Sequence, residues 1–443
     1  MRAEIGRKEM KINVIGAGLA GCEAAMQIAD RGVNVTLYEM KPQKKTPAHK
    51  SDLFGELVCS NSLKAMRVES AAGLLKEEMR RLGSFLMRCA DQCQVPAGGA
   101  LAVDREVFAR LVTEGIENHP NITVVHEEIT DIPTDGITVI ATGPLTSDAL
   151  AEKIENLFGD SLSFFDAAAP IVTAESIDMD YAFAASRYER GGEDDYINCP
   201  MNKEEYERFY NELINAERAP LHDFDVSNPK VYEGCMPVEI LAQRGEGTLR
   251  FGPMKPVGLT DPKTGHRPWA VLQLRKENTA GSMYNLVGFQ TNLKFPEQKR
   301  VFSMIPALHR AEFVRYGVMH RNTFLCSPRI LNADFSVKEN KSLFFAGQIT
   351  GVEGYMESAA SGIMAGINAV NALLGKPAVV LPETTMIGAL SRYISDPGVK
   401  KFQPMGANFG VLPELNNRPR DKKERGKAYA ERALQDLNNI LGE

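Results

Sequence analysis

The sequence predicts an α/β fold in which a Rossmann-like domain is interrupted by a smaller α+β insertion domain. Two glycine-rich junctions between a strand and a helix, at residues 16–21 and 347–355, lie near opposite ends of the 443-residue chain. Between them the alternation of strands and helices breaks at about residue 187 and resumes after about residue 301. We therefore expect residues 1–186 and 302–443 to build one domain, and residues 187–301 to form the insertion.

The N-terminal junction belongs to a strand–turn–helix–strand unit. Residues 11–15 are predicted to form a short apolar strand, 22–30 a helix and 33–38 a second strand, which ends on an acidic residue, Glu39. The turn between the first strand and the helix is Gly16-Ala17-Gly18-Leu-Ala-Gly21. This order and spacing match the Rossmann fingerprint, so the unit predicts a bound dinucleotide.

Each residue type in this unit suits a dinucleotide. Gly16 permits the tight turn, Gly18 lets a pyrophosphate approach the backbone, and Gly21 lets the helix pack closely on the strand. The N-terminus of the helix offers N–H groups and the positive end of its dipole to phosphates. Glu39 can accept hydrogen bonds from a ribose 2′-hydroxyl, which argues against a 2′-phosphate at this site.

Further strands and helices continue the first domain. Apolar residues at helical spacing predict a helix over residues 71–87, and a second helix is expected over 106–116. A strand over residues 122–125 and a buried strand that ends in Ala-Thr-Gly143 follow. In flavoproteins of the two-dinucleotide type the chain passes close to the nucleotide at such a segment, so Gly143 is a candidate cofactor-binding residue.

The C-terminal junction supplies a second candidate site. An apolar strand runs into Gly347-Gln-Ile-Thr-Gly351-Val-Glu-Gly354-Tyr355, and a helix rich in small residues, 358–374, follows. In large flavoproteins a junction of this kind places a helix N-terminus near the isoalloxazine. Together the two junctions narrow the expected dinucleotide to FAD. Tyr355 is predicted either to stack on the flavin or substrate or to be a core tyrosine.

Composition and charge exclude several classes of protein. No apolar run approaches the length of a membrane span, and the N-terminus lacks an apolar signal core. Seven scattered cysteines form no disulfide framework, so a reducing cytoplasm is expected. The net charge of −6 does not suggest nucleic acid, but residues 290–329 carry seven Lys or Arg against two acids, and residues 400–432 nine against four. These two basic segments are either solvated faces or part of an RNA-binding surface.

Two cysteines lie in loops among small polar residues, glycine and proline. Cys59 is part of Glu56-Leu-Val-Cys-Ser-Asn-Ser62, and Cys235 is part of Glu233-Gly-Cys-Met-Pro-Val-Glu239. A cysteine attacks or accepts a proton as the thiolate, which nearby cations favour, so both are candidate catalytic residues. The other cysteines and the histidines are expected to be structural or on the surface, with no metal site: Cys22, Cys89, Cys93, Cys326, His49, His309 and His320.

With these residues in view, the chain resembles the folate- and flavin-dependent tRNA (uracil-5-)-methyltransferases, short relatives of the large glucose-inhibited-division flavoproteins. The similarity extends over nearly the whole length, and the two cysteine motifs are its most specific part. It rests on the glycine turn 16–21, Thr46-Pro-Ala-His49, Leu57-Val-Cys-Ser-Asn-Ser62, Tyr232-Glu-Gly-Cys-Met-Pro-Val-Glu239, Leu286-Val-Gly-Phe-Gln-Thr-Asn292 and the junction 347–355. The fold that it implies is an FAD-binding domain of the glutathione-reductase type.

The resemblance also implies a reaction. Reduced FAD takes a methylene unit from 5,10-methylenetetrahydrofolate, a thiolate adds to C6 of uracil, and C5 accepts the carbon, which hydride reduces to methyl. The substrate is the T-loop uridine at position 54 of tRNA, and NADH or NADPH is the reductant. Cys235 is assigned as the nucleophile and Cys59 as the general base, although these roles can be exchanged.

The sequence leaves three other functions open. One alternative is a flavoenzyme of the same superfamily that modifies wobble uridine, and another is a plain FAD-dependent oxidoreductase. The length and the paired cysteine motifs argue against the first, and the two loop cysteines, far apart in the sequence, argue against the second. The third alternative is an RNA-binding protein in which FAD is only structural. The sequence is silent on the oligomeric state, and a monomer is compatible with it.

Overall fold

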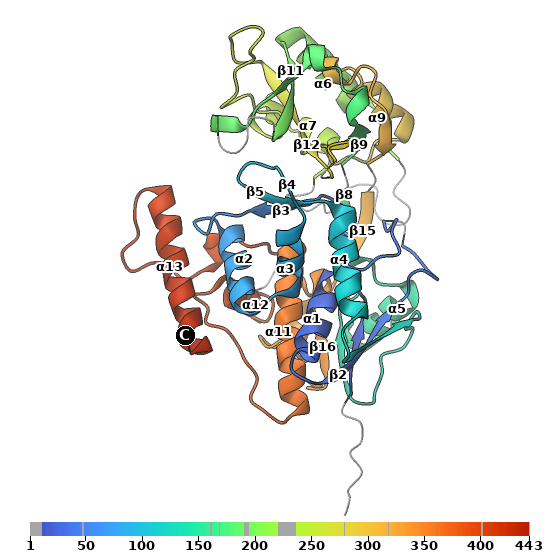
Figure 1. The fold of residues 1–443 in the computed structure, drawn as a ribbon, viewed down its shortest axis with the longest axis vertical. Coiled ribbons are helices and arrows are strands. Elements are labelled where there is room, and N and C mark those ends of the chain that lie inside the picture. Colours follow the sequence, from blue (N-terminus) through green and yellow to red (C-terminus); the bar gives the residue numbers. More distant parts are fainter. Residues whose placement is uncertain are drawn as a thin grey trace, which may run out of the picture.

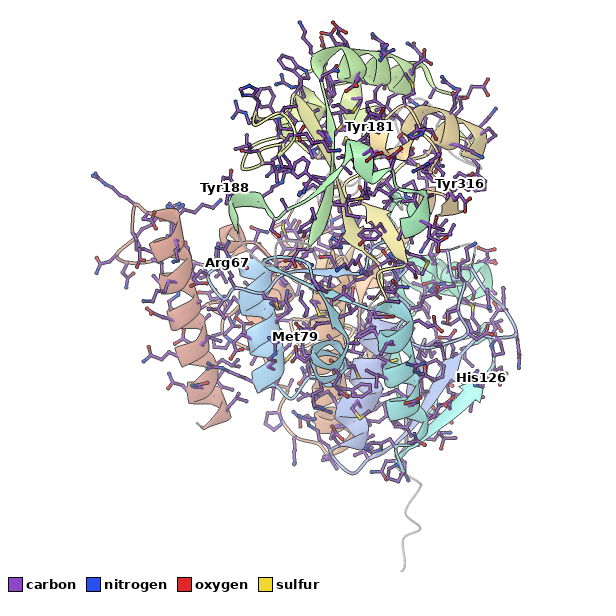
Figure 2. All side chains as sticks on the ribbon, turned by 45° about the horizontal axis from the view of Figure 1, so that its top comes forward. Arg67, Met79, His126, Tyr181, Tyr188 and Tyr316 are labelled. Carbon is purple, nitrogen blue, oxygen red and sulfur yellow. The ribbon has the colours of Figure 1, made fainter. Side chains whose placement is uncertain are left out.

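The molecule has two domains, each with its own large hydrophobic core (Figure 1). The larger core lies around a parallel sheet, and the smaller one lies around an antiparallel sheet. The structure is a computed structural model, and it describes residues 11–46, 48–159, 162–167, 169–189, 195–219, 236–278, 280–317, 319–399 and 402–442. In Figure 2, Tyr181 and Tyr316 lie in the antiparallel domain, and Met79 and His126 lie in the parallel domain. The predicted α/β class with a second, smaller domain is confirmed.

The parallel sheet gathers strands from both ends of the chain. Its order is β16 (Leu343–Phe345), β7 (Ile137–Ile140), β1 (Lys11–Ile15), β2 (Asn34–Glu39) and β6 (Ile122–His126). All neighbouring pairs in this sheet are parallel. The carboxyl ends of the strands therefore meet at one edge, which is where open α/β sheets bind their ligands.

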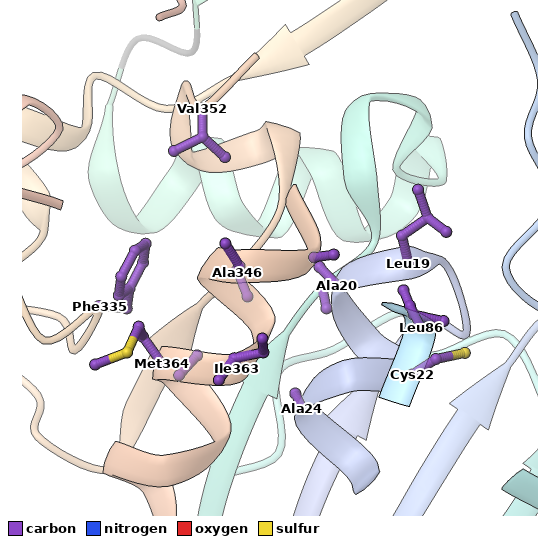
Figure 3. Close-up of a cluster of buried hydrophobic side chains, with 14 of the residues drawn as sticks. Leu19, Ala20, Cys22, Ala24, Leu86, Phe335, Ala346, Val352, Ile363 and Met364 are labelled. Atoms are coloured by element: carbon purple, nitrogen blue, oxygen red, sulfur yellow. The ribbon is translucent and has the colours of Figure 1, made fainter. Parts of the chain in front are cut away.

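Close packing between helices α1 (Leu19–Ala29) and α11 (Tyr355–Leu373) joins the two junctions (Figure 3). A Cβ at Gly362 would overlap the carbonyl oxygen of Ala20, and one at Gly366 would lie 2.7 Å from that of Ala24. Only residues without a side chain allow this approach, because interiors are close-packed. The N-termini of both helices are thereby set beside the sheet.

Further helices surround the parallel sheet. They are α2 (Ala71–Arg81), α3 (Phe85–Gln92), α4 (Arg105–Glu117), α5 (Asp148–Phe158), α10 (Ser327–Ile330), α12 (Met386–Tyr393) and α13 (Lys422–Leu441). Short 3-10 helices occur in both domains: Gly143–Leu145, Ala174–Ser176, Met179–Tyr181, Arg187–Glu189, Pro306–Leu308, Gln348–Thr350 and Phe409–Val411. Within the described ranges, no helix combines the length and the apolar character needed to cross a membrane.

The helix predicted over residues 71–87 is two helices, α2 and α3, so that prediction was wrong. Gly83 between them has a φ of +76°, and the Ser84 hydroxyl accepts the N–H of Met87 as an N-cap. The buried Glu23 carboxylate also accepts the N–H of Leu86, at 2.9 Å. A glycine followed by a serine cap therefore ends one helix and starts the next, although the apolar spacing continues.

The antiparallel domain has its own sheet and helices. The strand order is β10 (Phe183–Ala184), β11 (Tyr196–Met201), β12 (Ala270–Lys276), β13 (Met283–Leu286), β9 (Ile171–Thr173) and β14 (Phe313–Arg315). The helices are α6 (Lys203–Asn215), α7 (Val238–Ala242), α8 (Thr248–Phe251) and α9 (Phe295–Phe302).

Two small sheets lie near the junction between the domains in Figure 1. One consists of β3 (Ser62–Ala65), β5 (Ala100–Val103) and β4 (Gln94–Val95), and the other consists of β8 (Leu162–Ala167) and β15 (Met319–Phe324).

The second core extends beyond the limits expected for the insertion, residues 187 and 301. It runs from Val172 to Ala311, and strands β9 and β14 complete its sheet outside both limits. These strands have three residues each, which is too short for an alternating pattern to be visible in the sequence. We propose that the insertion spans residues 169–317.

Glu78 provides a test of the packing between α2 and α12. Its buried carboxylate accepts the N–H groups of Met386 and Ile387 at 2.7 and 2.9 Å, and burial raises its pKa to about 8. Because an unfolded glutamate ionises near pH 4.5, folding takes up a proton between these two values. We therefore expect this group to lower the free energy of unfolding as the pH rises from 5 to 8, by up to about 1.4 kcal/mol per pH unit.

Urea denaturation at several pH values measures this contribution. In Glu78→Gln the decrease in unfolding free energy between pH 5 and 8 should be smaller than in the unmodified chain. Glu77→Gln, on the same helix, is the matched control, since Glu77 pairs with Arg81 at the half-buried surface. Identical pH dependence in all three proteins would contradict the expectation.

Candidate active site

The first glycine turn has the conformation that its sequence requires. Gly16 has a φ of +100°, and a Cβ there would lie 2.8 Å from the carbonyl oxygen of Ala141, which follows β7. A Cβ at Gly21 would overlap the Gly16 carbonyl oxygen. Gly18 differs, because a Cβ there would meet nothing within 4 Å, and no side chain caps α1 at this residue. The turn is tightly packed on its inner side and open at Gly18.

Glu39 connects the end of β2 to this turn. Its side chain is buried, and its two oxygens accept the N–H groups of Ala17 at 2.8 Å and Lys41 at 3.0 Å. Each carboxylate oxygen can accept a further hydrogen bond. A cleft at this edge of the sheet is lined by Gly16, Ala17, Gly18, Glu39, Lys41, His49, Glu56, Glu128, Thr142 and Thr146, among others. Polar groups from both sides of the turn therefore face one cleft.

The other predicted glycines follow two more strands of the same sheet. Gly143, after β7, and Gly347, after β16, have φ values of +68° and +85°. Their strands are parallel to β1, so both glycines lie at the edge that carries Gly16 and Glu39. Gly351 instead packs against the Phe402 ring, which indicates a structural reason for that glycine.

Tyr355 brings the C-terminal junction to the first cysteine motif. It follows Gly354, which precedes α11 without a side-chain cap. The Tyr355 hydroxyl oxygen accepts the N–H of Cys59 at 2.6 Å and that of Ser60 at 3.2 Å. Burial, and then the neighbouring Cys59, raise the pKa of Tyr355 well above its usual value. The phenol thus stays protonated and keeps a proton to donate beside the cysteine loop.

Two arginines hold the carbonyl side of the same loop. Arg105, the first residue of α4, donates to the carbonyl oxygens of Leu57 at 2.7 Å and Cys59 at 3.3 Å. Arg315, the last residue of β14, donates to the carbonyl oxygen of Val58. The carbonyl oxygens of three successive residues, Leu57 to Cys59, therefore each accept a hydrogen bond from an arginine.

Asn61 and Arg275 attach the end of the loop to the antiparallel domain. Arg275 donates to the Asn61 side-chain oxygen at 3.0 Å and to the Ser60 hydroxyl at 2.8 Å. The fully buried Asn61 amide donates to the carbonyl oxygens of Val103 at 3.1 Å and Lys276 at 2.9 Å. Sequence reasoning missed Arg105, Arg275 and Arg315, because each is a single arginine in an ordinary helix or strand.

The second cysteine, Cys235, lies outside the described residues, but the motif that follows it is well anchored. The N–H of Val238 donates to the carbonyl oxygen of Gln290 at 2.7 Å. The buried Glu239 carboxylate accepts from the Thr291 hydroxyl and the Asn292 N–H, both at 2.8 Å. The second cysteine motif and the segment 286–292 are thus bound to each other.

Three other cysteines are buried, and His49 lines the cleft. Burial raises the pKa of Cys22, and it raises those of Cys89 and Cys93 to about 12, so these thiols stay protonated. His49 bonds to the Thr46 hydroxyl at 2.6 Å at the edge of the cleft, and burial lowers its pKa. In the described part of the chain, no group of three or more His, Cys, Asp or Glu side chains is placed to hold a metal ion.

Comparison with known proteins places this architecture in a family. Residues 11–377 match the family model described as glucose inhibited division protein A. The chain belongs to this family. Its resemblance to the family, inferred from the cysteine motifs and glycine junctions, is confirmed.

Relatives within the glucose inhibited division protein A family cover nearly the whole chain. The methylenetetrahydrofolate–tRNA-(uracil-5-)-methyltransferase TrmFO of Acetivibrio thermocellus is 61% identical over 431 residues, which are 97% of this chain and 98% of the relative. The protein of the same name from Ligilactobacillus salivarius is 60% identical over 430 residues, with the same coverage. The solved structure of Aquifex aeolicus GidA is 17% identical, with a TM-score of 0.70 over 98% of this chain and 73% of that chain, and supports the fold.

Removal of the Tyr355 hydroxyl tests its contact with the cysteine loop. In Tyr355→Phe the N–H groups of Cys59 and Ser60 lose their acceptor, which costs roughly 1–3 kcal/mol for a buried donor. Amide hydrogen exchange, followed by mass spectrometry over residues 57–61, should accelerate about tenfold or more. Tyr393→Phe is the control, because that hydroxyl donates to the Gln403 carbonyl oxygen elsewhere. Unchanged exchange in Tyr355→Phe would show that the contact does not order the loop.

Proposed function

We propose that this chain transfers the methylene carbon of 5,10-methylenetetrahydrofolate to C5 of a tRNA uridine, through reduced FAD, and reduces it to a methyl group. The product is 5-methyluridine, and the target is the T-loop uridine at position 54. The observation that carries the proposal is the contact between the Cys59 loop and Tyr355, at the glycine-rich edge of the parallel sheet. Relatives about 60% identical over nearly the full length, named for this reaction, support it.

The residues at the edge of the sheet fit FAD. Open space at Gly18 and the N-terminus of α1 suit a pyrophosphate, and Glu39 retains acceptor capacity for ribose hydroxyls. Gly143 and Gly347 allow the backbone to approach the ligand from two neighbouring strands. When bound, FAD supplies a carrier for both the carbon and the hydride. NADH or NADPH supplies the two electrons that conversion of a methylene into a methyl group requires.

Two thiolates carry out the chemistry on the uracil ring. A soft thiolate at Cys235 adds to C6 and makes C5 nucleophilic, and a thiolate at Cys59 takes the proton that C5 loses. Loss of that proton expels the Cys235 thiolate from C6, and hydride then completes the methyl group. The two roles can be exchanged. The Cys59 backbone is fixed by Tyr355 on one side and by arginines on the other, so its thiol is presented from an ordered loop. We propose the cytoplasm as the compartment of this chain, because such thiols require reducing conditions.

The chain after Cys59 leads from this loop to the proposed RNA-binding surface. Lys64, half-exposed, pairs with Glu357 at 2.8 Å, and Glu69 packs against Gly426 of α13. Near the start of helix α13, Lys422 and Lys423 are exposed, and the exposed Arg420 precedes them. Arg418 pairs with Glu414 at 3.6 Å, and Lys427 pairs with Glu431 at 3.8 Å. In Figure 2, Arg67 and the exposed Tyr188 lie on the same side of the molecule, one from each domain. Basic and aromatic groups of this kind suit phosphates and unstacked bases.

The first basic segment, 290–329, contributes less positive surface than its composition suggests. Lys294 pairs with Glu217 at 2.6 Å, and Arg300 pairs with Glu212 and Glu297. The Arg315 side chain is directed to the Cys59 loop. The C-terminal segment is therefore the stronger candidate for phosphate contacts.

Incubation with unmodified tRNA tests the reaction directly. The chain with FAD, labelled 5,10-methylenetetrahydrofolate and NADH or NADPH should form labelled 5-methyluridine in the T-loop, and S-adenosylmethionine should contribute no carbon. Cys235→Ala should lose the product while it keeps FAD and tRNA binding, and Cys59→Ala should also lose the product. Cys199→Ala, at a buried thiol of strand β11, is the control. Normal methylation by Cys235→Ala would overturn the assignment. Modification at the wobble uridine, or flavin oxidation with no labelled tRNA, would favour the alternative functions.

Cofactor affinity tests the role of Glu39. Glu39→Gln keeps the size of the side chain but removes its charge, and hydrogen bonds to charged acceptors are worth roughly 1.5–3 kcal/mol. FAD should therefore bind the cofactor-free variant about tenfold to a hundredfold more weakly, as measured by fluorescence titration. Glu106→Gln, at an exposed residue of α4, should bind FAD normally. Equal affinities would remove Glu39 from the cofactor site.

A further inference from the structure

We propose that Arg275 and Arg315 of the antiparallel domain, together with Arg105, position Cys59 and hold its side chain as a thiolate. The reactivity of a thiol carried by the parallel domain is then set by the other domain. The inference rests on the proposed function for its biological meaning, but it concerns a property of Cys59 that exists without substrate.

The first support is the way in which the loop is held. The carbonyl oxygens of Leu57, Val58 and Cys59 face the guanidinium groups, and the N–H groups of Cys59 and Ser60 face the Tyr355 hydroxyl. The peptide groups on both sides of the Cys59 Cα therefore have partners. A side chain on such a backbone has few orientations, which is what proton transfer at a fixed distance requires.

The second support is the charge next to the loop. Arg105 forms an ion pair with Glu277, whose side chain is almost completely buried, and Arg275 and Arg315 act on the same carboxylate. Three guanidinium groups and one carboxylate leave a positive excess, because guanidinium stays charged in proteins. Burial removes much of the water that would screen this excess. This positive excess therefore favours the thiolate form of the Cys59 side chain over the neutral thiol.

Other charged groups near the loop are paired: the Glu56 carboxylate lies 4.0 Å from the Lys41 amine. Lys64 and Glu357 form an ion pair with each other, and Tyr355 stays neutral. Burial lowers the pKa of Arg315, whereas the charge of Cys59 raises it. This coupling is mutual, so the Arg315 cation favours the Cys59 thiolate to the same extent.

The third support is the origin of the arginines. Arg275 lies on β12 and Arg315 at the end of the edge strand β14, both in the antiparallel sheet, whereas Arg105 begins α4 in the parallel domain. Arg275 is 6% exposed, although a surface arginine would be free to stay in water. The cost of burying such a cation is offset by hydrogen bonds to the loop and by charge of the opposite sign. The Cys59 loop is thus part of the contact between the two domains.

The rate at which Cys59 reacts with iodoacetamide, measured from pH 5 to 10, tests the proposal. Trypsin cleavage after Lys50 and Lys64 gives a peptide in which Cys59 is the single cysteine, so mass spectrometry of the purified FAD-containing protein isolates its signal. The variants are Arg315→Met, Arg315→Lys and Glu277→Gln. Arg110→Met, at an exposed arginine of α4, is the matched control.

The variants should shift the pH midpoint of alkylation in opposite directions. In Arg315→Met the midpoint should rise by about one unit and the rate at pH 7 should fall about tenfold, whereas Arg315→Lys should restore the midpoint. Glu277→Gln, which removes the negative charge, should lower the midpoint. Arg110→Met should leave it unchanged. A merely structural role would change the limiting rate of the variants without moving the midpoint.

An unchanged midpoint in both Arg315→Met and Glu277→Gln would overturn the proposal. If Arg315→Met does not fold, Glu277→Gln decides alone, and a midpoint that fails to fall overturns it. The assay contains neither folate nor tRNA, so its outcome is independent of methylation. Absence of 5-methyluridine together with shifted midpoints would refute the proposed function and leave the role of the arginines intact.

Discussion

The contact between α1 and α11 is the constraint on which the rest of the structure depends. These helices come from opposite ends of the chain, and Gly362 and Gly366 let α11 approach the backbone of α1. A larger residue at either glycine would push α11 away from the sheet. Because α11 begins at Tyr355, its position also decides where that hydroxyl meets the Cys59 loop. Packing between small residues therefore sets the geometry of polar groups at the far end of the same helix.

Much of the fold could be predicted because its signals are local. The order of strand, glycine turn, helix and acidic residue places Glu39 at the glycine turn, and the structure shows its oxygen on the Ala17 N–H. The second junction could also be recognised from its glycines. The break between α2 and α3 was missed, because a Gly83-Ser84 cap is a weaker pattern than the apolar spacing that continues across it.

The candidate site was less predictable, because its contacts join residues far apart in the sequence. The motif around Cys59 is visible as a motif, but nothing near it indicates that Arg275 and Arg315 bind its backbone. A single arginine in a strand is usually a surface residue. Its burial follows from how two domains meet, which no periodicity or spacing encodes. The limits expected for the insertion stay a prediction. Strands β9 and β14, which lie outside those limits, have three residues each and are recognisable only by their pairing within the antiparallel sheet.

The pairing of β9 with β14, and of β8 with β15, means that the insertion leaves and re-enters the parallel domain through adjacent strands. The two points at which the insertion is attached are therefore neighbours. An insertion joined in this way can be exchanged without rearrangement of the parallel sheet. The arginines show why such an exchange is not neutral in this chain. A parallel domain without the insertion would lose Arg275, which donates to the Ser60 hydroxyl, and Arg315, which donates to the Val58 carbonyl oxygen. The insertion and the parallel domain are therefore structurally coupled at the loop that carries Cys59.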